Sequence, residues 1–446
     1  MAVRPSRTVR TLRRRAAGAK VGPRPQAAKS PQKIHPQEGV SPLSRKPKRD
    51  LTMEEQLARG PMDLPFLMLT LILLGIGLIM VFSASYASAY YDPDVSSPMF
   101  YIQRQALFAG AGLVVMYLVS KINYQTLRIL ALPMLVGSIF LLVLALTPLG
   151  VEINQVKRWL KIFIVAGPTY QPSEIAKVTV IIFFAARLSK RDTEKHKKYT
   201  NRTLTGRTLN RLDRIGFLEL VPYGVVLVIV LALVVLEPHM SGTILIMVGA
   251  ASVLFAAGIH LGWFAAAGSL AVGGLALIIF TTDYMTNRIK LWLDPWEDAR
   301  GLGFQTIQAL IAEGSGGLLG LGLGKSRQKV LYIPEPENDF IFPIVVEELG
   351  FIGGAIVLIL FALLILRGYW LALHARDKFG TLTVVGIITL LAFQVFLNVG
   401  VVTNLIPNTG ISLPFFSYGG TALMIHLAEM GVILSISRQC PAPKKD

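Results

Sequence analysis

Apolar runs close to the length of a membrane-spanning helix constrain this chain more than any other feature. About 20 helical residues cross the roughly 30 Å hydrocarbon core of a bilayer. The runs fall at about 64–86, 104–120, 129–148, 174–188, 217–236, 242–259, 263–282, 340–366, 381–402 and 417–437. Of 446 residues, 53% are hydrophobic and 16% are charged. The sequence therefore predicts an all-α polytopic membrane protein with about ten transmembrane helices.

Positive charge is concentrated in two segments that flank the apolar runs. Residues 1–60 carry 15 Lys and Arg against 4 Asp and Glu, and residues 187–214 carry 10 against 3. Basic flanking segments usually stay on the cytoplasmic side and attract anionic lipid, so the net charge of +17 does not argue for nucleic-acid binding. Ten helices then place both termini in the cytoplasm, and they place residues 149–173 and a large loop at 283–339 outside.

Three parts follow from this pattern. Residues 1–60 predict a disordered basic cytoplasmic tail, because few of them can be buried, and its end, "LTMEEQLARG", predicts a short amphipathic juxtamembrane segment. The tail lacks the features of a cleaved secretory signal. Residues 61–438 form the transmembrane domain, and residues 439–446 form a cytoplasmic C-terminal tail. The single cysteine, Cys440, excludes an intramolecular disulfide.

Cations in the two predicted outer segments run against the charge rule. An anionic ligand at the outer surface would explain them, and pairing with neighbouring acids is the alternative. The first segment contains Lys157, Arg158 and Lys161; the second contains Arg288, Lys290, Arg300, Lys325, Arg327 and Lys329.

The glycine-rich stretch "GLGLGKS", Gly320 to Ser326, does not fit a phosphate-binding loop. That motif needs a glycine at the position of Leu319. The glycines instead predict an irregular backbone that packs against helix ends or a ligand. The stretch "NTGISLPFFSYGGT", residues 408–421, is also interrupted by Pro and Gly, and it predicts a re-entrant wall of a site.

Two pairs of ionisable residues stand at helical spacing inside apolar runs. Glu174 and Lys177 in "QPSEIAK" lie three residues apart, which allows a mutual ion pair that either orients the helix or lines a polar cavity. His426 and Glu429 share a helix face, and an intrahelical bond is favoured there over a ligand role. No His, Cys, Asp and Glu spacing is typical of a zinc site.

Three carboxylates, Asp294, Glu297 and Asp298, cluster in "IKLWLDPWEDARG" within the large outer loop. This segment and four others, in consistent order, resemble the SEDS family (shape, elongation, division, sporulation), the FtsW/RodA/SpoVE group, and are most like its FtsW/SpoVE branch. The five stretches are "GVEINQVKRWLKI" with "QPSEIAK", "DPWEDARGLGFQTIQAL", "GLGLGKSRQKVLYIPEPENDFIFPIVVEELGFIGG" and "IPNTGISLPFFSYGGT".

The resemblance implies a peptidoglycan glycosyltransferase of cell division or sporulation in a bacterial cytoplasmic membrane, with its active site facing outside. Its substrate would be lipid II, a polyprenyl pyrophosphate lipid, and its partners a class B penicillin-binding protein transpeptidase and divisome proteins. The family's catalytic aspartate lies in a Pro-Trp-x-Asp motif, which here ends at Asp298. The chain departs from the family at His239, where an aspartate is frequent, and at Ala299, where a proline is common.

Sugar transfer from a pyrophosphate needs a base for the attacking hydroxyl and positive charge for the departing diphosphate. One carboxylate and several cations suffice, unlike in a glycosidase. Asp298 is the expected base; a divalent cation, Mg²⁺ or Mn²⁺, bridging it to the pyrophosphate would help, although the sequence does not require a cofactor. The candidate substrate-binding residues are Lys157, Arg158, Glu174, Lys177, Arg288, Trp296, Gln305, Lys329 and Ser417.

Two alternatives stay open at this point. A transporter that flips the lipid-linked precursor would also place polar groups in spans, but it predicts charges throughout the bilayer and internal repeats. The charges here gather at the outer end, and no repeat is evident. A non-enzymatic division scaffold would instead act through its basic tail.

Overall fold

The structure is a computed structural model that describes residues 60–91, 93, 95, 97–153, 156–161, 169–190, 217–237, 239–269, 273, 289–301 and 303–440, with the side chains of residues 153, 156, 157, 169 and 217–219 left aside. The chain divides into two units, Met1–Asp50 and Leu51–Asp446. The predicted basic tail, most of the 187–214 segment and the last six residues lie outside the described residues.

Helices dominate the described part of the chain, and they coincide with the apolar runs. Six are long and apolar enough to cross a membrane: α2 (Leu64–Tyr91), α3 (Phe100–Lys121), α4 (Gln125–Leu146), α12 (Ile341–Leu373), α13 (Lys378–Val402) and α14 (Gly420–Ser437). Three further helices are α5 (Pro172–Leu188), α7 (Phe217–Leu236) and α8 (Met240–Ala256). The run at 263–282 is helical over 261–269, and most of its remainder lies outside the description. The chain is a multi-pass membrane protein.

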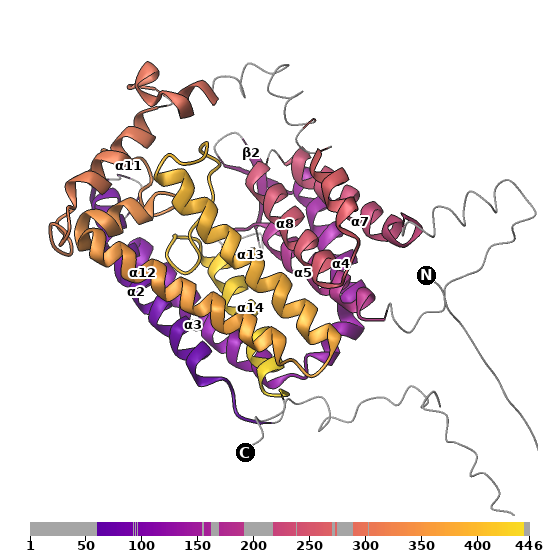
Figure 1. Cartoon of the computed structure of the whole chain (residues 1–446). Helices are drawn as coiled ribbons and strands as arrows, with labels where there is room; N and C mark the ends of the chain where they lie inside the picture. Colours follow the sequence, from indigo (N-terminus) through magenta and orange to yellow (C-terminus); the bar gives the residue numbers. More distant parts are fainter. Residues whose placement is uncertain are drawn as a thin grey trace, which may run out of the picture. The chain divides into compact units, whose positions relative to one another are not determined.

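The helices pack so that α13 and α14 lie centrally. In α14, 67% of an 18-residue apolar stretch is buried inside the protein, whereas in α3 the corresponding share is 22%. α14 runs along α3, α12 lies between α2 and α13, and α5 packs on α4 and α8 (Figure 1). Glycines permit the closest approach: a Cβ at Gly431 of α14 would lie 2.7 Å from the carbonyl oxygen of Met116 in α3.

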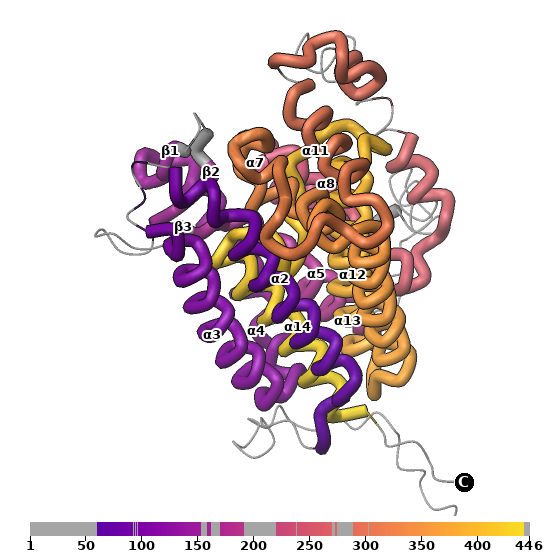
Figure 2. The backbone as a smooth tube through the Cα atoms, turned by 90° about the vertical axis from the view of Figure 1, so that its left-hand side faces the viewer, coloured from indigo at the N-terminus to yellow at the C-terminus, as the bar shows by residue number. Residues whose placement is uncertain are grey.

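A small antiparallel sheet follows α4 and precedes α5, which is an exception to the predicted all-α fold. Its strands β1 (Gly150–Ile153), β2 (Val156–Lys161) and β3 (Thr169–Tyr170) are ordered β1-β2-β3, with Leu160 opposite Tyr170. The segment is too short and too polar for a span, so its backbone pairs across a hairpin instead. We call the end of the bundle that carries this sheet and α11 (Phe304–Ser315) the loop end (Figure 2).

Helix α12 is broken at Gly350, which has φ 74° and ψ −179°. Carbonyl groups of the preceding loop accept the hydrogen bonds that the break removes from the helix. The N–H of Phe351 donates to the carbonyl of Gly317 (2.8 Å), and the N–H of Ile352 donates to that of Leu318 (3.2 Å). A Cβ at Gly350 would collide with the backbone of Gly320. Glycine is therefore required by both the left-handed φ and the close approach.

Side-chain contacts join the helices at the end of the bundle opposite the loop end. Arg367 of α12 donates to both carboxylate oxygens of Asp63 (Nε at 3.0 Å, Nη2 at 2.5 Å) and stacks 4.1 Å over the ring of Trp370. Asp63 also accepts from the N–H of Phe66 in the first turn of α2 (2.9 Å), and its own N–H donates to Ser437 Oγ at the end of α14 (3.3 Å). The start of α2 and the end of α14 thus meet.

Candidate active site

Asp298 is exposed at the end of a short 3₁₀ helix, η2 (Pro295–Asp298), at the loop end. Asp294 caps this turn, because its Oδ1 accepts from the N–H of Trp296 (3.0 Å), and proline suits the first helical position. The carboxylate of Asp298 folds over the next turn so closely that a side chain at Gly301 would collide with it. Trp296 is 64% exposed. The predicted base is accessible to a large substrate.

The segment that carries η2 is anchored on the end of α13. Trp292 Nε1 donates to the carbonyl of Asn404 (3.1 Å), and Asn404 Nδ2 donates to the carbonyl of Trp292 (3.2 Å). Asn404 has a left-handed φ of 57°, which asparagine tolerates better than most residues. The two reciprocal bonds hold the η2 segment against the helix bundle.

A buried ion pair begins α5, as the sequence predicted. Lys177 Nζ lies 2.7 Å from Glu174 Oε2, and the two residues are 2% and 8% exposed. The imidazoles of His239 and His426 lie near Glu174, so the pair belongs to a polar cluster between α5, α8 and α14. A charged pair at this depth persists only with such partners.

Both histidines of this polar cluster are hydrogen-bonded. The predicted intrahelical bond between His426 Nδ1 and Glu429 Oε2 is present (3.0 Å), and Gln394 Nε2 lies 3.4 Å from His426 Nε2. His239 precedes α8, where its Nδ1 lies 3.1 Å from Ser173 Oγ. Burial lowers the pKa of His239 to about 4, so its imidazole is neutral at neutral pH and has one donor and one acceptor nitrogen.

Arg158 of β2 lies among acids at the loop end. Its Nε donates to the carbonyl of Glu237 (3.0 Å). The Glu237 side chain is fully buried, and neither of its carboxyl oxygens has a hydrogen-bond partner. Burial raises the pKa of Glu237 to about 8, with Arg158 opposing the shift. Burial and the nearby Glu335 likewise raise the pKa of Asp339 to about 6, against the charge of Arg158.

Lys329 is engaged in an internal ion pair. Its Nζ lies 2.7 Å from Glu348 Oε1 and 2.9 Å from Ser83 Oγ, and the residue is 6% exposed. Its ammonium therefore binds α12 and α2 in this structure. Contact between Lys329 and a substrate pyrophosphate stays a prediction, and it would require Lys329 to share or exchange its partners.

The backbone N–H groups of the glycine-rich stretch form an anion-binding cluster, which we call the nest, and carboxylates of α12 occupy it. N–H groups at 324 and 326 donate to Glu348 (2.9 and 3.3 Å), and the N–H of Arg327 donates to Glu347 (2.9 Å). Ser326 Oγ also donates to Glu347. Such N–H clusters commonly bind phosphates, but here two buried carboxylates of α12 occupy the position. The sequence contained a signal for this arrangement, namely two adjacent acids in the apolar run "FPIVVEELGF". The expectations for the loop cations did not include these acids as their partners.

The remaining candidates differ in their surroundings. Ser417 holds the re-entrant loop, because its Oγ accepts from the N–H of Leu413 (2.7 Å) and its carbonyl accepts from Gln105 Nε2 (3.1 Å). Gln305 Nε2 donates to the carbonyl of Pro334 (3.3 Å). Lys157 lies on β2, with its side chain outside the description, and Arg288 lies outside the described residues.

The donors at Asp298 fit a divalent cation only in part. Within the described ranges, no group of three His, Cys, Asp or Glu side chains is placed to hold a metal ion. The exposed carboxylate of Asp298 could supply one oxygen ligand, and Mg²⁺ is usually held by one or two carboxylates together with substrate phosphates. The substrate would have to complete such a site.

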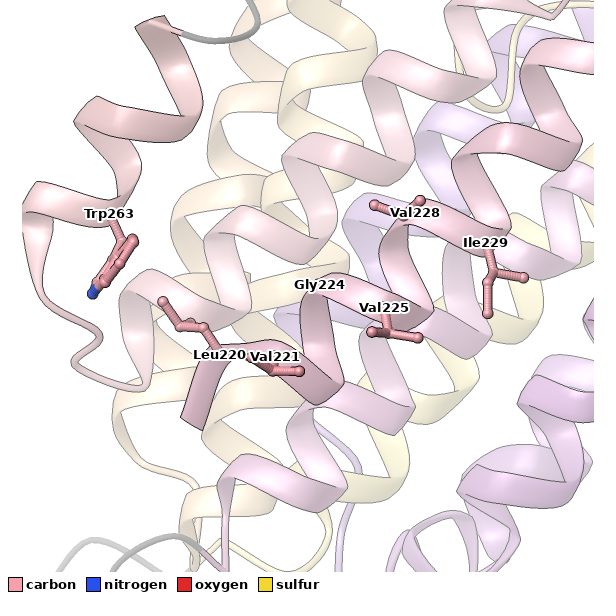
Figure 3. A pocket seen from close by; sticks show the side chains of 7 residues that line it. All are labelled: Leu220, Val221, Gly224, Val225, Val228, Ile229 and Trp263. Carbon is pink, nitrogen blue, oxygen red and sulfur yellow. The ribbon is translucent and has the colours of Figure 1, made fainter. Parts of the chain in front are cut away.

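An apolar groove of about 440 Å³ lies apart from these polar groups. It runs along one face of α7, past Leu220, Gly224 and Val228, and Trp263 faces it from the helical stretch at 261–269, which follows α8 (Figure 3). Its lining offers no ionisable side chain. The groove therefore has no part in proton transfer.

Comparison with known proteins identifies the relatives of this chain. The family model for cell cycle proteins of the FtsW/RodA/SpoVE type matches residues 64–441. Stage V sporulation protein E of Bacillus subtilis (strain 168) is 43% identical over 378 residues, which cover 84% of this chain and 97% of that protein. The probable peptidoglycan glycosyltransferase FtsW of Geobacter sp. (strain M18) is 36% identical over 376 residues, 84% of this chain and 96% of that protein.

Two solved structures share the fold. A chain of a peptidoglycan synthase complex that coordinates polymerization and crosslinking has a TM-score of 0.64 and 26% identity, covering 84% of this chain and 98% of that one. The rod shape determining protein RodA of Thermus thermophilus has a TM-score of 0.57 and 26% identity, covering 86% of this chain and 98% of that one.

Proposed function

Because this chain belongs to the FtsW/RodA/SpoVE family of cell cycle proteins, we propose that it is a peptidoglycan glycosyltransferase that polymerises lipid II in cell division or sporulation. The observation that carries the proposal is the exposed Asp298 on an anchored turn at the loop end. Relatives that match nearly their whole length are named as glycosyltransferases of this kind.

Asp298 acts as the general base in this reaction. Its carboxylate takes the proton from the attacking sugar hydroxyl while the hydroxyl oxygen forms a bond to the anomeric carbon of the second lipid-linked sugar. The bond from that carbon to the pyrophosphate oxygen breaks, and the polyprenyl pyrophosphate leaves with the electron pair. Attack opposite the leaving group inverts the anomeric centre.

Cations at the loop end stabilise the departing diphosphate. Arg158 is one candidate, since its guanidinium lies at the loop end, where its Nε donates to the carbonyl of Glu237. Lys157, on the same strand, and Arg288 are further candidates. Glu174 positions Lys177 through their 2.7 Å pair. Asp298 would supply one oxygen ligand to a Mg²⁺ or Mn²⁺ ion, which would neutralise further charge on the leaving group. Trp296, Gln305 and Ser417 complete the candidate contacts.

Ten spans with both termini in the cytoplasm place this site outside. The hydrogen bond between the start of α2 and the end of α14, from Asp63 to Ser437, supports an even number of crossings. The basic segments at 1–60 and 187–214 support a cytoplasmic position for that end. The loop end, with Asp298 in the large loop at 283–339, then faces the outer surface of the bacterial cytoplasmic membrane.

A class B penicillin-binding protein is the expected partner, because growing glycan strands need crosslinking. The structural neighbour from a peptidoglycan synthase complex, which couples polymerization with crosslinking, supports this pairing. Divisome proteins are further expected partners through the division or sporulation branch.

The test is polymerisation of lipid II by the purified full-length protein, with and without its transpeptidase partner. Asp298→Asn should abolish glycan while preserving folding and lipid II binding. Glu297→Gln is the matched control, because it removes the neighbouring exposed carboxylate of the same turn, and it should leave polymerisation intact. Equal polymer from Asp298→Asn and wild type would remove Asp298 as the base.

The same preparation separates the two alternatives. Lipid II translocation in vesicles without polymer, even with the partner present, would favour a transporter. Neither translocation nor polymer, together with normal growth of an Asp298→Asn strain, would favour a scaffold.

A further inference from the structure

The loop before α12 exposes six large apolar side chains within sixteen residues. We call residues 317–332 the leucine loop. Leu319 is 80% exposed, Leu318 is 69% exposed and Leu331 is 63% exposed. Large contiguous apolar patches mark interaction sites or membrane contact. The exposed apolar side chains of the loop are Leu318, Leu319, Leu323, Val330, Leu331 and Tyr332.

Helix lengths place the leucine loop at the outer edge of the hydrocarbon core. The inner edge lies near Arg367, which pairs with Asp63 at the start of α2. About 20 residues span the core, so on α12 the outer edge falls near residue 347. Counting the same length along α2 from residue 64 reaches about residue 84, and Ser83 bonds Glu348 (2.7 Å). Both helices give the same level.

The leucine loop continues the lipid-facing surface of α12. Its backbone bonds to α12 just after the break, through the carbonyls of Gly317 and Leu318. The adjoining α12 side chains Phe351 and Ile352 are 65% and 47% exposed, as expected for a face toward lipid. Leu318 and Leu319 therefore extend an apolar face that is already exposed on a membrane span.

Two cations stand among these apolar side chains. Lys325 and Arg327 are exposed, and neither takes part in a salt bridge of the described residues. The nearby acids Glu347 and Glu348 are 1% exposed and are occupied by the nest. Long basic side chains at such a level reach from the apolar layer to lipid phosphates.

We propose that the leucine loop inserts its apolar side chains into the outer leaflet and binds the phosphates of anionic phospholipids through Lys325 and Arg327. The apolar residues supply burial in hydrocarbon, and the cations supply preference for anionic headgroups. A protein surface would need acidic groups and a complementary apolar groove at the same site. At this level of the bilayer, lipid provides both hydrocarbon for the apolar side chains and phosphates for the cations.

Depth is tested with one fluorophore on the full-length protein in nanodiscs. Cys440 is the only native cysteine, so a Cys440→Ser background accepts Leu319→Cys labelled with an environment-sensitive dye. Glu297→Cys, exposed on η2, is the control. Nitroxide lipids should quench the label at 319 severalfold more than the label at 297. Equal, weak quenching at both positions would overturn insertion.

Headgroup preference is tested with the same label at 319. Quenching by nitroxide phosphatidylglycerol should exceed that by nitroxide phosphatidylcholine, with a local enrichment of roughly fivefold for each cation. The preference should vanish in Lys325→Gln/Arg327→Gln. It should persist in Lys290→Gln/Arg300→Gln, which removes the same charge from exposed positions beside η2.

Two results would overturn this proposal. An unchanged ratio in Lys325→Gln/Arg327→Gln would remove the phosphate contact. Loss of lipid quenching at 319 when the transpeptidase partner is added would show that the surface belongs to a protein interface. Size-exclusion chromatography of every labelled variant reports folding, and loss of the catalytic assignment to Asp298 would leave both lipid measurements interpretable.

Discussion

The buried pair between Lys329 and Glu348 should be sensitive to the removal of either partner. Lys329→Met keeps the length of the side chain but leaves the Glu348 carboxylate with only Ser83 Oγ and the N–H groups at 324 and 326 as donors, at 2.7, 2.9 and 3.3 Å. Removing one partner of a buried pair costs about 3–5 kcal/mol. These three donors offset part of it, so we expect a loss near 3 kcal/mol.

Glu348→Gln should cost more than Lys329→Met. A glutamine presents one acceptor and one NH₂ donor to four donors, and the ammonium of Lys329, 6% exposed, is left without a counter-charge. At roughly 2.1 cal/mol/K of unfolding entropy per residue, the midpoint of a chain of 446 residues shifts by about 1 °C per kcal/mol, so single variants should lower the thermal midpoint by about 3–5 °C. Size-exclusion chromatography after heating in detergent measures that midpoint.

The double variant Lys329→Met/Glu348→Gln should be more stable than Glu348→Gln alone, because no charge remains buried and the amide oxygen still accepts from the nest. The coupling energy from the double-mutant cycle should reach about 1–3 kcal/mol. Additive effects, or single shifts below about 2 °C, would refute the reasoning. Polymerisation restored in the double variant would also show that the Lys329 charge does not contact substrate.

Three further outcomes are expected. Glu237 has a pKa of about 8 in the fold against an ordinary 4.5, so its contribution to stability is fully present below pH 4.5 and is lost as the pH rises to about 8. The thermal midpoint should therefore fall between pH 4.5 and 8 and level off above pH 8, and Glu237→Gln should flatten that fall. Gly350→Ala should cost about 2 kcal/mol or more through its φ of 74°, whereas Gly75→Ala, which meets nothing within 4 Å, should not destabilise; thermal midpoints compare them. Arg367→Lys retains charge but loses the two-point contact and the stacking on Trp370, so it should lower the midpoint by about 1 °C.

Sequence reasoning was most successful where interactions are local. Nine apolar runs coincide with helices because a span must satisfy its backbone within itself, and hydrophobicity alone then marks it. The pairs Glu174–Lys177 and His426–Glu429 are present because residues three apart share a helix face. The seventh run lies largely outside the described residues, and the site roles of these residues stay predictions.

Contacts between distant segments could not be predicted in the same way. Arg367 pairs with Asp63 across 304 positions, and Arg158 meets Glu237 across 79. Neither partner has a sequence feature that selects the other, because the pairing depends on how the helices pack. The cations at 325–329 suggested an external anion, because the sequence does not reveal that this segment packs on α12. In the structure two carboxylates of α12, Glu347 and Glu348, accept hydrogen bonds from the segment.

The break at Gly350 also has a consequence for the protein's slow motions. Amide hydrogens at 351 and 352 are protected by carbonyls of the preceding loop rather than by their own helix, while those at 321 and 322 are protected by carbonyls of α12 at 347 and 348. Neither set of amides can exchange with solvent deuterium unless the loop at 317–322 separates from α12 at 347–352. The loop and the helix junction should therefore exchange as one cooperative unit, with a single opening rate shared by amides about thirty positions apart.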